Sequence, residues 1–444
     1  MKIWIKNPLY ILAENSDGGI LVEDNKIIEL IPSGKKPSTL YDSIFDAHNH
    51  IILPGLINLH HHFYQTLTRV LPTAINKKLF PWLQTLYPIW AGLTPDALRI
   101  STRLAISELL LSGCTTTSDH HYIFPSGLEN AIDIQVEEAK NLGIRIIFCR
   151  GSMDLSQKDG GLPPDSVVQN SDEILKDSQR LIKKYHDSSQ GAMTQIALAP
   201  CSPFSVSEKL MVDTAIMAEE NDVLLHTHLA ETEDENRFCL EKMGCRPIEY
   251  LEKVGWLNKR TWLAHGIHFT DKEILKLAKA KIGISHCPTS NMLLSSGVCR
   301  IPDMENSGLS VGLGVDGSAS NDASNLSYEV RIAFLLQRLH YGTKVTHLDA
   351  LRWATEGGAK VLQRKELGCI SKGLQADLAF FKLDELRFSG NGDPLAALII
   401  CGANKADRVM IAGKWIVEDG QILGIDLQKL LDSHNKEALN LQIN

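Results

Sequence analysis

Two segments of the sequence place histidines two residues apart at the end of an apolar run. "GLINLHHH" ends in His60, His61 and His62, and "VLLHTHLAE" contains His226 and His228. Side chains two residues apart on a strand point to the same side, so His60 and His62 can converge on one ion while His61 faces away. Because imidazole nitrogens are common metal ligands, this pattern predicts a metal site that uses His60 and His62.

The second histidine pair and the last apolar run supply two further ligand candidates. His228 lies nearer the end of its run than His226, so we expect His228 to be the third ligand and His226 to lie deeper. The run "SVGLGVDGS" contains Asp316, whose carboxylate can complete the set. Three imidazoles and one carboxylate suit one divalent metal ion, Zn²⁺ in the first place and Fe²⁺ as the alternative, with one position left for water.

Apolar runs of strand length alternate with helical patterns between residues 55 and 364. The runs are "GLINLHHH", "CTTTSDHH", "IRIIFCRGS", "TQIALAPCS", "VLLHTHLAE", "TWLAHGIH", "KIGISHCPTSN" and "SVGLGVDGS". Continuous apolar runs are typical of parallel strands covered on both faces, and eight such units predict a (β/α)8 TIM barrel, an α/β fold. Nearly every run ends in polar or titratable residues, and in a closed barrel these ends meet at the face where active sites lie.

The two ends of the chain differ from this middle part. "GGILVEDNKIIELIPSG" and "KADRVMIAGKWIVEDGQIL" consist of short strands joined by tight turns. We therefore expect residues 1–54 and 365–444 to form one small β-sandwich domain, and residues 55–364 to form the metal-dependent catalytic barrel. The "HNH" segment at residues 48–50 has the spacing of a ligand pair, but it precedes Pro54 and is expected to lie in the small domain.

Composition narrows the possible partners and the location. The chain has 45 Lys and Arg against 53 Asp and Glu, a net charge of −8, which disfavours nucleic-acid binding because such binding depends on basic contacts to phosphates. No apolar stretch approaches the length of a membrane-spanning helix, and Lys6, Asn7 and Pro8 interrupt the first apolar run, so we expect neither a membrane anchor nor a signal peptide. The nine cysteines lack paired spacing, which indicates free thiols and a cytoplasmic protein. We further expect a homo-oligomer.

Several segments resemble the amidohydrolase superfamily, in its nucleobase and triazine aminohydrolase branch. These segments are "PGLINLHHH", "HTHLAET", "LAHGIH", "SHCPTSN" and "GVDGSASND", and the resemblance extends over nearly the whole chain. Longer blocks such as "GCTTTSDHHYIFP" and "RGSMDLSQKDGGLPPDSVVQ" are similar to the deaminases of 8-oxoguanine in that branch. The resemblance implies a small-molecule nucleobase substrate: an oxidised purine, foremost 8-oxoguanine, deaminated by hydrolysis to urate and ammonia, with isocytosine as a possible second substrate.

The resemblance also implies a role for each residue of the site. The metal ligands would be His60, His62, His228 and Asp316, and Asp316 would also take the proton of the attacking water. Glu231 matches the acid that shuttles protons in the deaminases, and His265 matches the histidine beside that water. Two-metal members carry a modified Lys on the fourth strand, but "TQIALAPCSPF" contains no Lys, which implies a single ion.

Substrate contacts are expected from Gln65, Cys201, Ser202 and His265. The amide of Gln65 can donate and accept hydrogen bonds at the edge of a purine, although packing is an alternative role for it. Guanine deaminases carry an Arg where this chain has Cys201 and Ser202, which argues against plain guanine as the preferred substrate. Three aromatic residues after the first strand, Trp82, Tyr87 and Trp90, would serve either as a lid or as core.

Three other functions fit parts of the same pattern. A guanine deaminase or an s-triazine amino- or chlorohydrolase would use the same metal site on another ring. A barrel that has lost its metal and serves as a scaffold would lack the ligands, yet the ligand set here is complete. The sequence leaves the roles of His61, His120, His121, His226 and His286 open.

Overall fold

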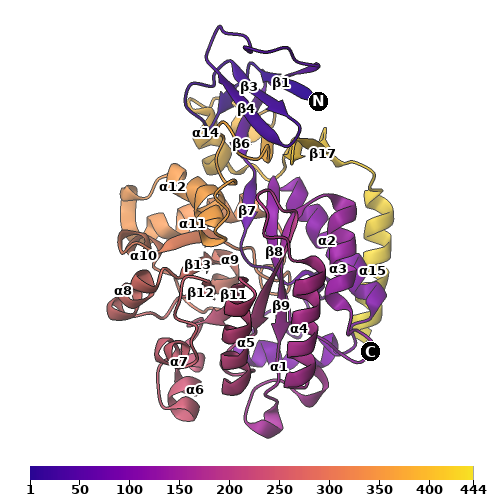
Figure 1. The fold of residues 1–444 in the computed structure, drawn as a ribbon, viewed down its shortest axis with the longest axis vertical. Coiled ribbons are helices and arrows are strands. Elements are labelled where there is room, and N and C mark those ends of the chain that lie inside the picture. Colours follow the sequence, from indigo (N-terminus) through magenta and orange to yellow (C-terminus); the bar gives the residue numbers. More distant parts are fainter. Residues whose placement is uncertain (444) are drawn as a thin grey trace.

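Eight parallel strands close into a barrel at the centre of the protein (Figure 1). The computed structural model describes residues 1–443. The barrel strands are β7 (Leu56–Asn58), β8 (Cys114–His121), β9 (Arg145–Ser152), β10 (Thr194–Pro200), β11 (Leu224–Leu229), β12 (Thr261–His265), β13 (Gly283–His286) and β14 (Ser310–Leu313). They follow one another around the barrel in chain order, and each apolar run identified in the sequence supplies one strand. The predicted (β/α)8 barrel is therefore confirmed.

Helices cover the outside of the barrel, and local signals define where several of them begin and end. The Thr94 side chain accepts a hydrogen bond from the Ala97 backbone N–H and so caps α2 (Pro95–Leu111). Gly143, in the left-handed conformation, ends α3 (Ala131–Leu142). The other helices of this layer are α4 (Ser171–Tyr185), α5 (Glu208–Glu220), α6 (Glu233–Met243), α7 (Pro247–Lys253), α8 (Asp271–Ala280), α9 (Pro288–Leu293), α10 (Ile301–Asn306), α11 (Leu326–Tyr341), α12 (His347–Arg352) and α13 (Gly358–Val361).

Two sheets from the chain ends form the small domain above the barrel in Figure 1. One sheet has the order β4–β3–β1–β5 and the other the order β18–β17–β16–β15–β6–β2, so segments from both ends of the chain pair in the second sheet. These strands are β1 (Lys2–Lys6), β2 (Tyr10–Ile11), β3 (Gly19–Glu23), β4 (Lys26–Ile31), β5 (Ser43–Asp46), β6 (His50–Pro54), β15 (Leu378–Lys382), β16 (Arg408–Ile411), β17 (Lys414–Glu418) and β18 (Gln421–Ile422). His50 lies on β6 and its Nε2 pairs with Asp407 Oδ2 at 2.8 Å, so the "HNH" segment belongs to this domain.

Two contacts tie the chain ends to the barrel. The Arg145 guanidinium, at the start of β9, donates to both carboxylate oxygens of Asp377 at 2.9 and 3.1 Å, and both side chains are buried. The last helix, α15 (Leu427–Ile443), leaves the small domain and runs beside α2 (Figure 1). Its His434 Nε2 lies 3.0 Å from the Thr66 hydroxyl. The C-terminal part of the 365–444 segment thus contacts the barrel, and the predicted domain boundaries stay a prediction.

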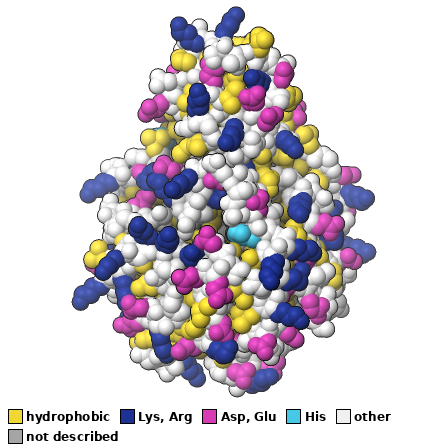
Figure 2. Space-filling view, in the orientation of Figure 1, with side chains coloured by type: hydrophobic (Ala, Val, Ile, Leu, Met, Phe, Trp, Pro, Cys, Tyr) yellow, Lys and Arg dark blue, Asp and Glu magenta, His cyan; other side chains and the backbone are white. Residues whose placement is uncertain are grey.

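The distribution of charged side chains on the surface and the apolar character of the helices both agree with the composition of the chain. Basic and acidic side chains are interspersed over the face shown in Figure 2 and do not gather into one basic patch. Within residues 1–443, no helix combines the length and the apolar character needed to cross a bilayer.

Candidate active site

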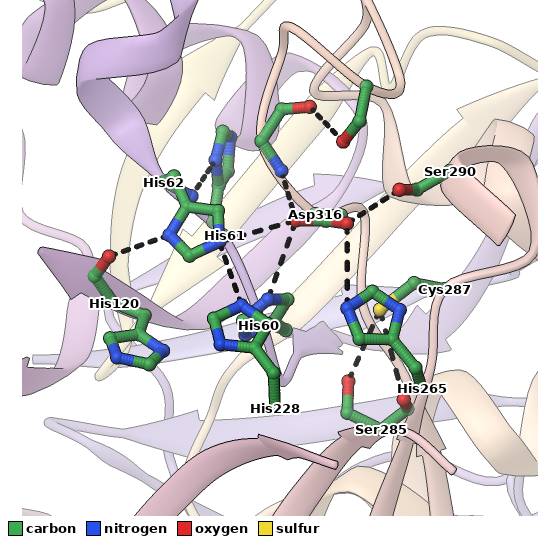
Figure 3. Close-up of polar contacts among 12 residues, drawn as sticks. His60, His61, His62, His120, His228, His265, Ser285, Cys287, Ser290 and Asp316 are labelled. Carbon is green, nitrogen blue, oxygen red and sulfur yellow. Dashed lines mark hydrogen bonds and ion pairs between the residues drawn. The ribbon is translucent and has the colours of Figure 1, made fainter. Parts of the chain in front are cut away.

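Residues from three barrel strands meet at the C-terminal end of the barrel (Figure 3). His60 and His62 follow β7, His228 lies on β11, and Asp316 follows β14. The Asp316 Oδ1 atom lies 3.4 Å from the Nε2 atoms of both His60 and His62. The Nε2 atoms of His62 and His228 are 3.2 Å apart. The structure therefore brings together all four residues that the sequence suggested as ligands.

Hydrogen bonds to backbone carbonyls fix the protons of His62 and His228. Nδ1 of His62 lies 2.6 Å from the His120 carbonyl oxygen, and Nδ1 of His228 lies 2.7 Å from that of Cys201. A carbonyl oxygen only accepts, so both Nδ1 atoms carry the hydrogen and both Nε2 atoms carry a lone pair. Two lone pairs that face each other at 3.2 Å repel unless a cation lies between them.

A chain of two hydrogen bonds fixes the proton of His60 in the same way. Nδ1 of His226 donates to the Trp262 carbonyl oxygen at 3.0 Å, which leaves Nε2 of His226 as an acceptor. His60 Nδ1 then donates to that Nε2 at 2.7 Å. The remaining Nε2 of His60 is buried, has no hydrogen-bond donor among the described residues, and faces Asp316. The three imidazoles lie close enough together to share one ion, and the Asp316 carboxylate oxygen lies 3.4 Å from two of their bare nitrogens, which fits a divalent cation.

The pKa values of these groups favour the same charge states. Burial lowers the pKa of His60 and His62, and it lowers the pKa of His228 to about 3, so the imidazoles are neutral at physiological pH. Burial alone would raise the pKa of Asp316, but the pKa lies well below the usual range, because the cationic form of the nearby His265, whose own pKa is raised, favours the ionised carboxylate. Neutral imidazoles beside an ionised carboxylate form the donor set that Zn²⁺ prefers.

An acid and a further imidazole lie beside the ligand set. His265 Nε2 lies 3.5 Å from Glu231 Oε2 and 3.9 Å from Asp316 Oδ2, while its Nδ1 pairs with Asn291 Oδ1 at 2.8 Å. Burial raises the pKa of Glu231 to about 7, so this carboxyl is partly protonated at neutral pH. Ser290 donates to Asp316 Oδ2 at 2.6 Å and so orients the carboxylate. The arrangement can therefore both accept and supply protons next to the metal position.

Backbone strain accompanies two of these residues. His265 and Asp316 both adopt positive φ angles, 71° and 64°, which residues other than glycine rarely do. His265 is the last residue of β12 and Asp316 follows the end of β14, and the side chains of both face the ligand set (Figure 3). Strained conformations of this kind cluster at functional sites, where the surrounding structure holds them in place.

A pocket adjoins the ligand set, and the predicted substrate contacts line this pocket. Gln65, Cys201 and Ser202 line the same pocket as Glu231 and His265. One wall comes from α1 (Leu79–Trp90), which contributes Leu79, Trp82, Leu83 and Tyr87. Trp90, by contrast, is buried in the core against Tyr64, with ring centroids 5.3 Å apart.

The remaining histidines occupy other positions. His61 Nε2 pairs with the Ser324 hydroxyl at 2.8 Å, so its ring faces away from the ligand set, as the strand alternation predicts. His120 presents its carbonyl oxygen to His62, and its ring Nε2 lies 2.8 Å from the Ala199 carbonyl oxygen. His121 and His286 are buried, and neither ring has a hydrogen-bond partner among residues 1–443.

Tyr122, Ser290 and Asn291 are among the residues of the site that sequence reasoning missed. Tyr122 lines the pocket and lies directly after the polar end of β8. Ser290 and Asn291 orient Asp316 and His265. Both belong to the "SHCPTSN" segment, whose polar residues after a strand were a signal that could have been followed.

Comparison with known proteins agrees with this geometry. A family model described as the amidohydrolase family matches residues 51–416. The chain belongs to the amidohydrolase family. As an amidohydrolase it is a hydrolase that acts on C–N bonds, in a metal-dependent family, and these two predictions are confirmed.

Several characterised amidohydrolases resemble this one over nearly their whole length. The 8-oxoguanine deaminase of Pseudomonas aeruginosa is 55% identical, over 98% of each chain. The hydroxydechloroatrazine ethylaminohydrolase of Pseudomonas sp. (strain ADP) is 35% identical, over 93% of this chain and 88% of the relative. The crystal structure of atrazine chlorohydrolase from Arthrobacter aurescens TC1 complexed with zinc superimposes with a TM-score of 0.92 at 31% identity, over 98% of this chain and 100% of the other.

Proposed function

We propose that this amidohydrolase hydrolyses the exocyclic amino group of 8-oxoguanine, giving urate and ammonia. The observation that carries the proposal is the cluster of three bare imidazole nitrogens and one carboxylate beside Glu231, a buried acid facing the same pocket. The 55% identity to an 8-oxoguanine deaminase supports the choice of substrate. Water supplies the new carbonyl oxygen, and the amino group leaves as ammonia.

The metal in this proposal is a single Zn²⁺ held by His60, His62, His228 and Asp316, with Fe²⁺ as the alternative. When bound, such an ion lowers the pKa of water so that a nucleophile is available near neutral pH. Strand β10 (Thr194–Pro200) carries no Lys that could bridge a second ion, which supports a count of one.

The proton transfers fall to three side chains. Asp316 stays ionised and is placed to accept the proton of the attacking water. Glu231, partly protonated, donates its proton to the ring nitrogen next to the reacting carbon. The water proton held by Asp316 then reaches the leaving amine by way of Glu231, and the hydroxyl proton on the reacting carbon restores Glu231 as the carbonyl forms. His265, between these two carboxyl groups, orients the water. General acid–base help of this kind contributes roughly 10²–10⁴-fold to the rate.

The pocket walls support a flat, polar substrate. Gln65, Cys201 and Ser202 offer an amide, a thiol and a hydroxyl to a ring held between apolar surfaces such as Trp82 and Leu294. Isocytosine is the second substrate of this proposal, since it presents the same amino-bearing carbon. The cytoplasmic location and the homo-oligomer stay predictions.

The test combines metal analysis with ammonia release from 8-oxoguanine, isocytosine, guanine and a hydroxytriazine. We expect about one ion per chain, highest kcat/KM on 8-oxoguanine, and loss of activity on chelation that added Zn²⁺ or Fe²⁺ restores. The His228→Ala variant should lose both the metal and the turnover. Preference for guanine or for the hydroxytriazine would contradict the substrate assignment, and turnover without metal would contradict the mechanism.

A further inference from the structure

One hydroxyl of the pocket has no hydrogen-bond partner among residues 1–443. Tyr87, on α1, is fully buried and lines the pocket, and its hydroxyl pairs with no described residue. The Oε1 atom of Gln65, on the same pocket, is also buried without a partner. Buried polar groups are nearly always hydrogen-bonded, so a ligand that fills this pocket is expected to supply both an acceptor and a donor.

The surroundings of Tyr87 make its hydroxyl a donor. Burial raises the pKa of Tyr87 well above its ordinary value, and the nearby Cys201 and Tyr122 raise it further, so the phenol keeps its proton. Tyr87 stands on the α1 wall of the pocket with Leu79, Trp82 and Leu83, whereas the Tyr122 ring lies 5.0 Å from that of the ligand candidate His62. The α1 wall contributes none of the four ligand candidates, so Tyr87 can contact a part of the substrate other than the reacting carbon.

The shape of a purine indicates which of its atoms would lie near Tyr87. In a purine, the amino-bearing C2 and the C8 atom lie at opposite ends of the long axis. If C2 lies beside Glu231, the C8 end points away from the ligand set. An 8-oxopurine carries a carbonyl oxygen there, which accepts hydrogen bonds, whereas guanine carries only C–H at that atom.

We propose that the Tyr87 hydroxyl donates a hydrogen bond to the C8 carbonyl oxygen and so selects oxidised purines over unoxidised ones. This inference rests on the proposed function, because it requires the substrate to enter with C2 at the metal. A site that hydrogen-bonds a substrate group discriminates against analogues that lack it, since the protein group is then left buried and unpaired.

Urate and xanthine provide a binding test that needs no turnover. Neither has an amino group to lose, and they differ by the C8 oxygen and its adjacent N–H. We would measure the Kd of each by calorimetry on zinc-loaded wild type, Tyr87→Phe and Tyr250→Phe. Tyr250 is a matched control, because its hydroxyl is also buried without a partner but lies on α7, outside the pocket.

Tyr87→Phe should weaken urate binding by roughly 10- to 100-fold, the cost of one lost hydrogen bond in a buried site, and change xanthine binding less than twofold. Tyr250→Phe should change neither. In turnover, Tyr87→Phe should lower kcat/KM for 8-oxoguanine by a similar factor and leave isocytosine, which has no C8, unchanged.

Two results would overturn the inference alone: unchanged urate binding in Tyr87→Phe, or equal losses for urate and xanthine, which would make Tyr87 a packing residue. Failure of wild type to release ammonia from 8-oxoguanine would instead remove the proposed function, and the inference with it. The two failures are distinguished by the wild-type assay.

Discussion

The His226 imidazole connects the ligand His60 to the barrel wall, and its removal should weaken metal binding without removing a ligand. His226 accepts from His60 Nδ1 at 2.7 Å, donates to the Trp262 carbonyl oxygen at 3.0 Å, and stacks on the Trp262 indole at 4.2 Å between centroids. In His226→Phe the ring keeps this stacking, but both hydrogen bonds are lost. The His60 N–H is then left buried without an acceptor.

The expected loss of Zn²⁺ affinity follows from the unpaired His60 N–H. A buried donor without a partner costs about 1–3 kcal/mol, and loss of a residue that orients a metal ligand typically lowers affinity about 10- to 100-fold. We therefore expect the Kd for Zn²⁺ to rise by that factor, measured by competition with a chromophoric chelator. His226→Gln, whose amide oxygen can accept from His60, should recover part of the affinity.

Two outcomes would refute this reasoning. An unchanged Zn²⁺ Kd in His226→Phe would mean that His60 needs no acceptor at Nδ1. An equal loss in His226→Gln and His226→Phe would mean that ring packing, and not the hydrogen bond, positions His60. A circular dichroism spectrum that matches wild type would show that the barrel is intact in both variants.

Three further predictions concern other contacts. Glu231→Gln should keep wild-type metal content and lose at least about 10²-fold in kcat, because the acid is gone; near-normal kcat would remove Glu231 from the mechanism. A Cβ on Gly317 would lie 1.9 Å from Gln65 Oε1, so the Gly317→Ala substitution should displace the Gln65 amide. We expect this variant to have a higher KM for 8-oxoguanine and an unchanged metal content. An unchanged KM would exclude Gln65 as a substrate contact. Asp377→Asn removes the charge partner of buried Arg145 and should lower the free energy of unfolding by about 3–5 kcal/mol in urea titrations, whereas a loss below about 1 kcal/mol would show the pair to be dispensable.

The local sequence pattern was sufficient to predict the barrel strands that position the site. Each apolar run became a barrel strand because a parallel strand covered on both faces requires a continuous apolar sequence, and that requirement is visible without the fold. Alternation along a strand likewise separated His61 from His60 and His62, and the structure shows His61 bonded to Ser324 instead of facing the ligand set.

Contacts between distant segments were beyond the reach of the sequence. The resemblance to amidohydrolases named ligands and acid, but spacing does not reveal that His226 reaches His60 across the barrel, or that Ser290 and Asn291 hold Asp316 and His265. Nor does it reveal that α15, expected within the sandwich segment, packs beside α2.

The sequence by itself determined the barrel, the residue types of the site and the strand ends on which they stand, because strand periodicity and ligand chemistry are local properties. Only the tertiary structure decided which nitrogen of each imidazole is free to bind a metal and which hydroxyl of the pocket has no partner. Those properties depend on what lies opposite each atom, and that neighbour comes from a segment far away along the chain.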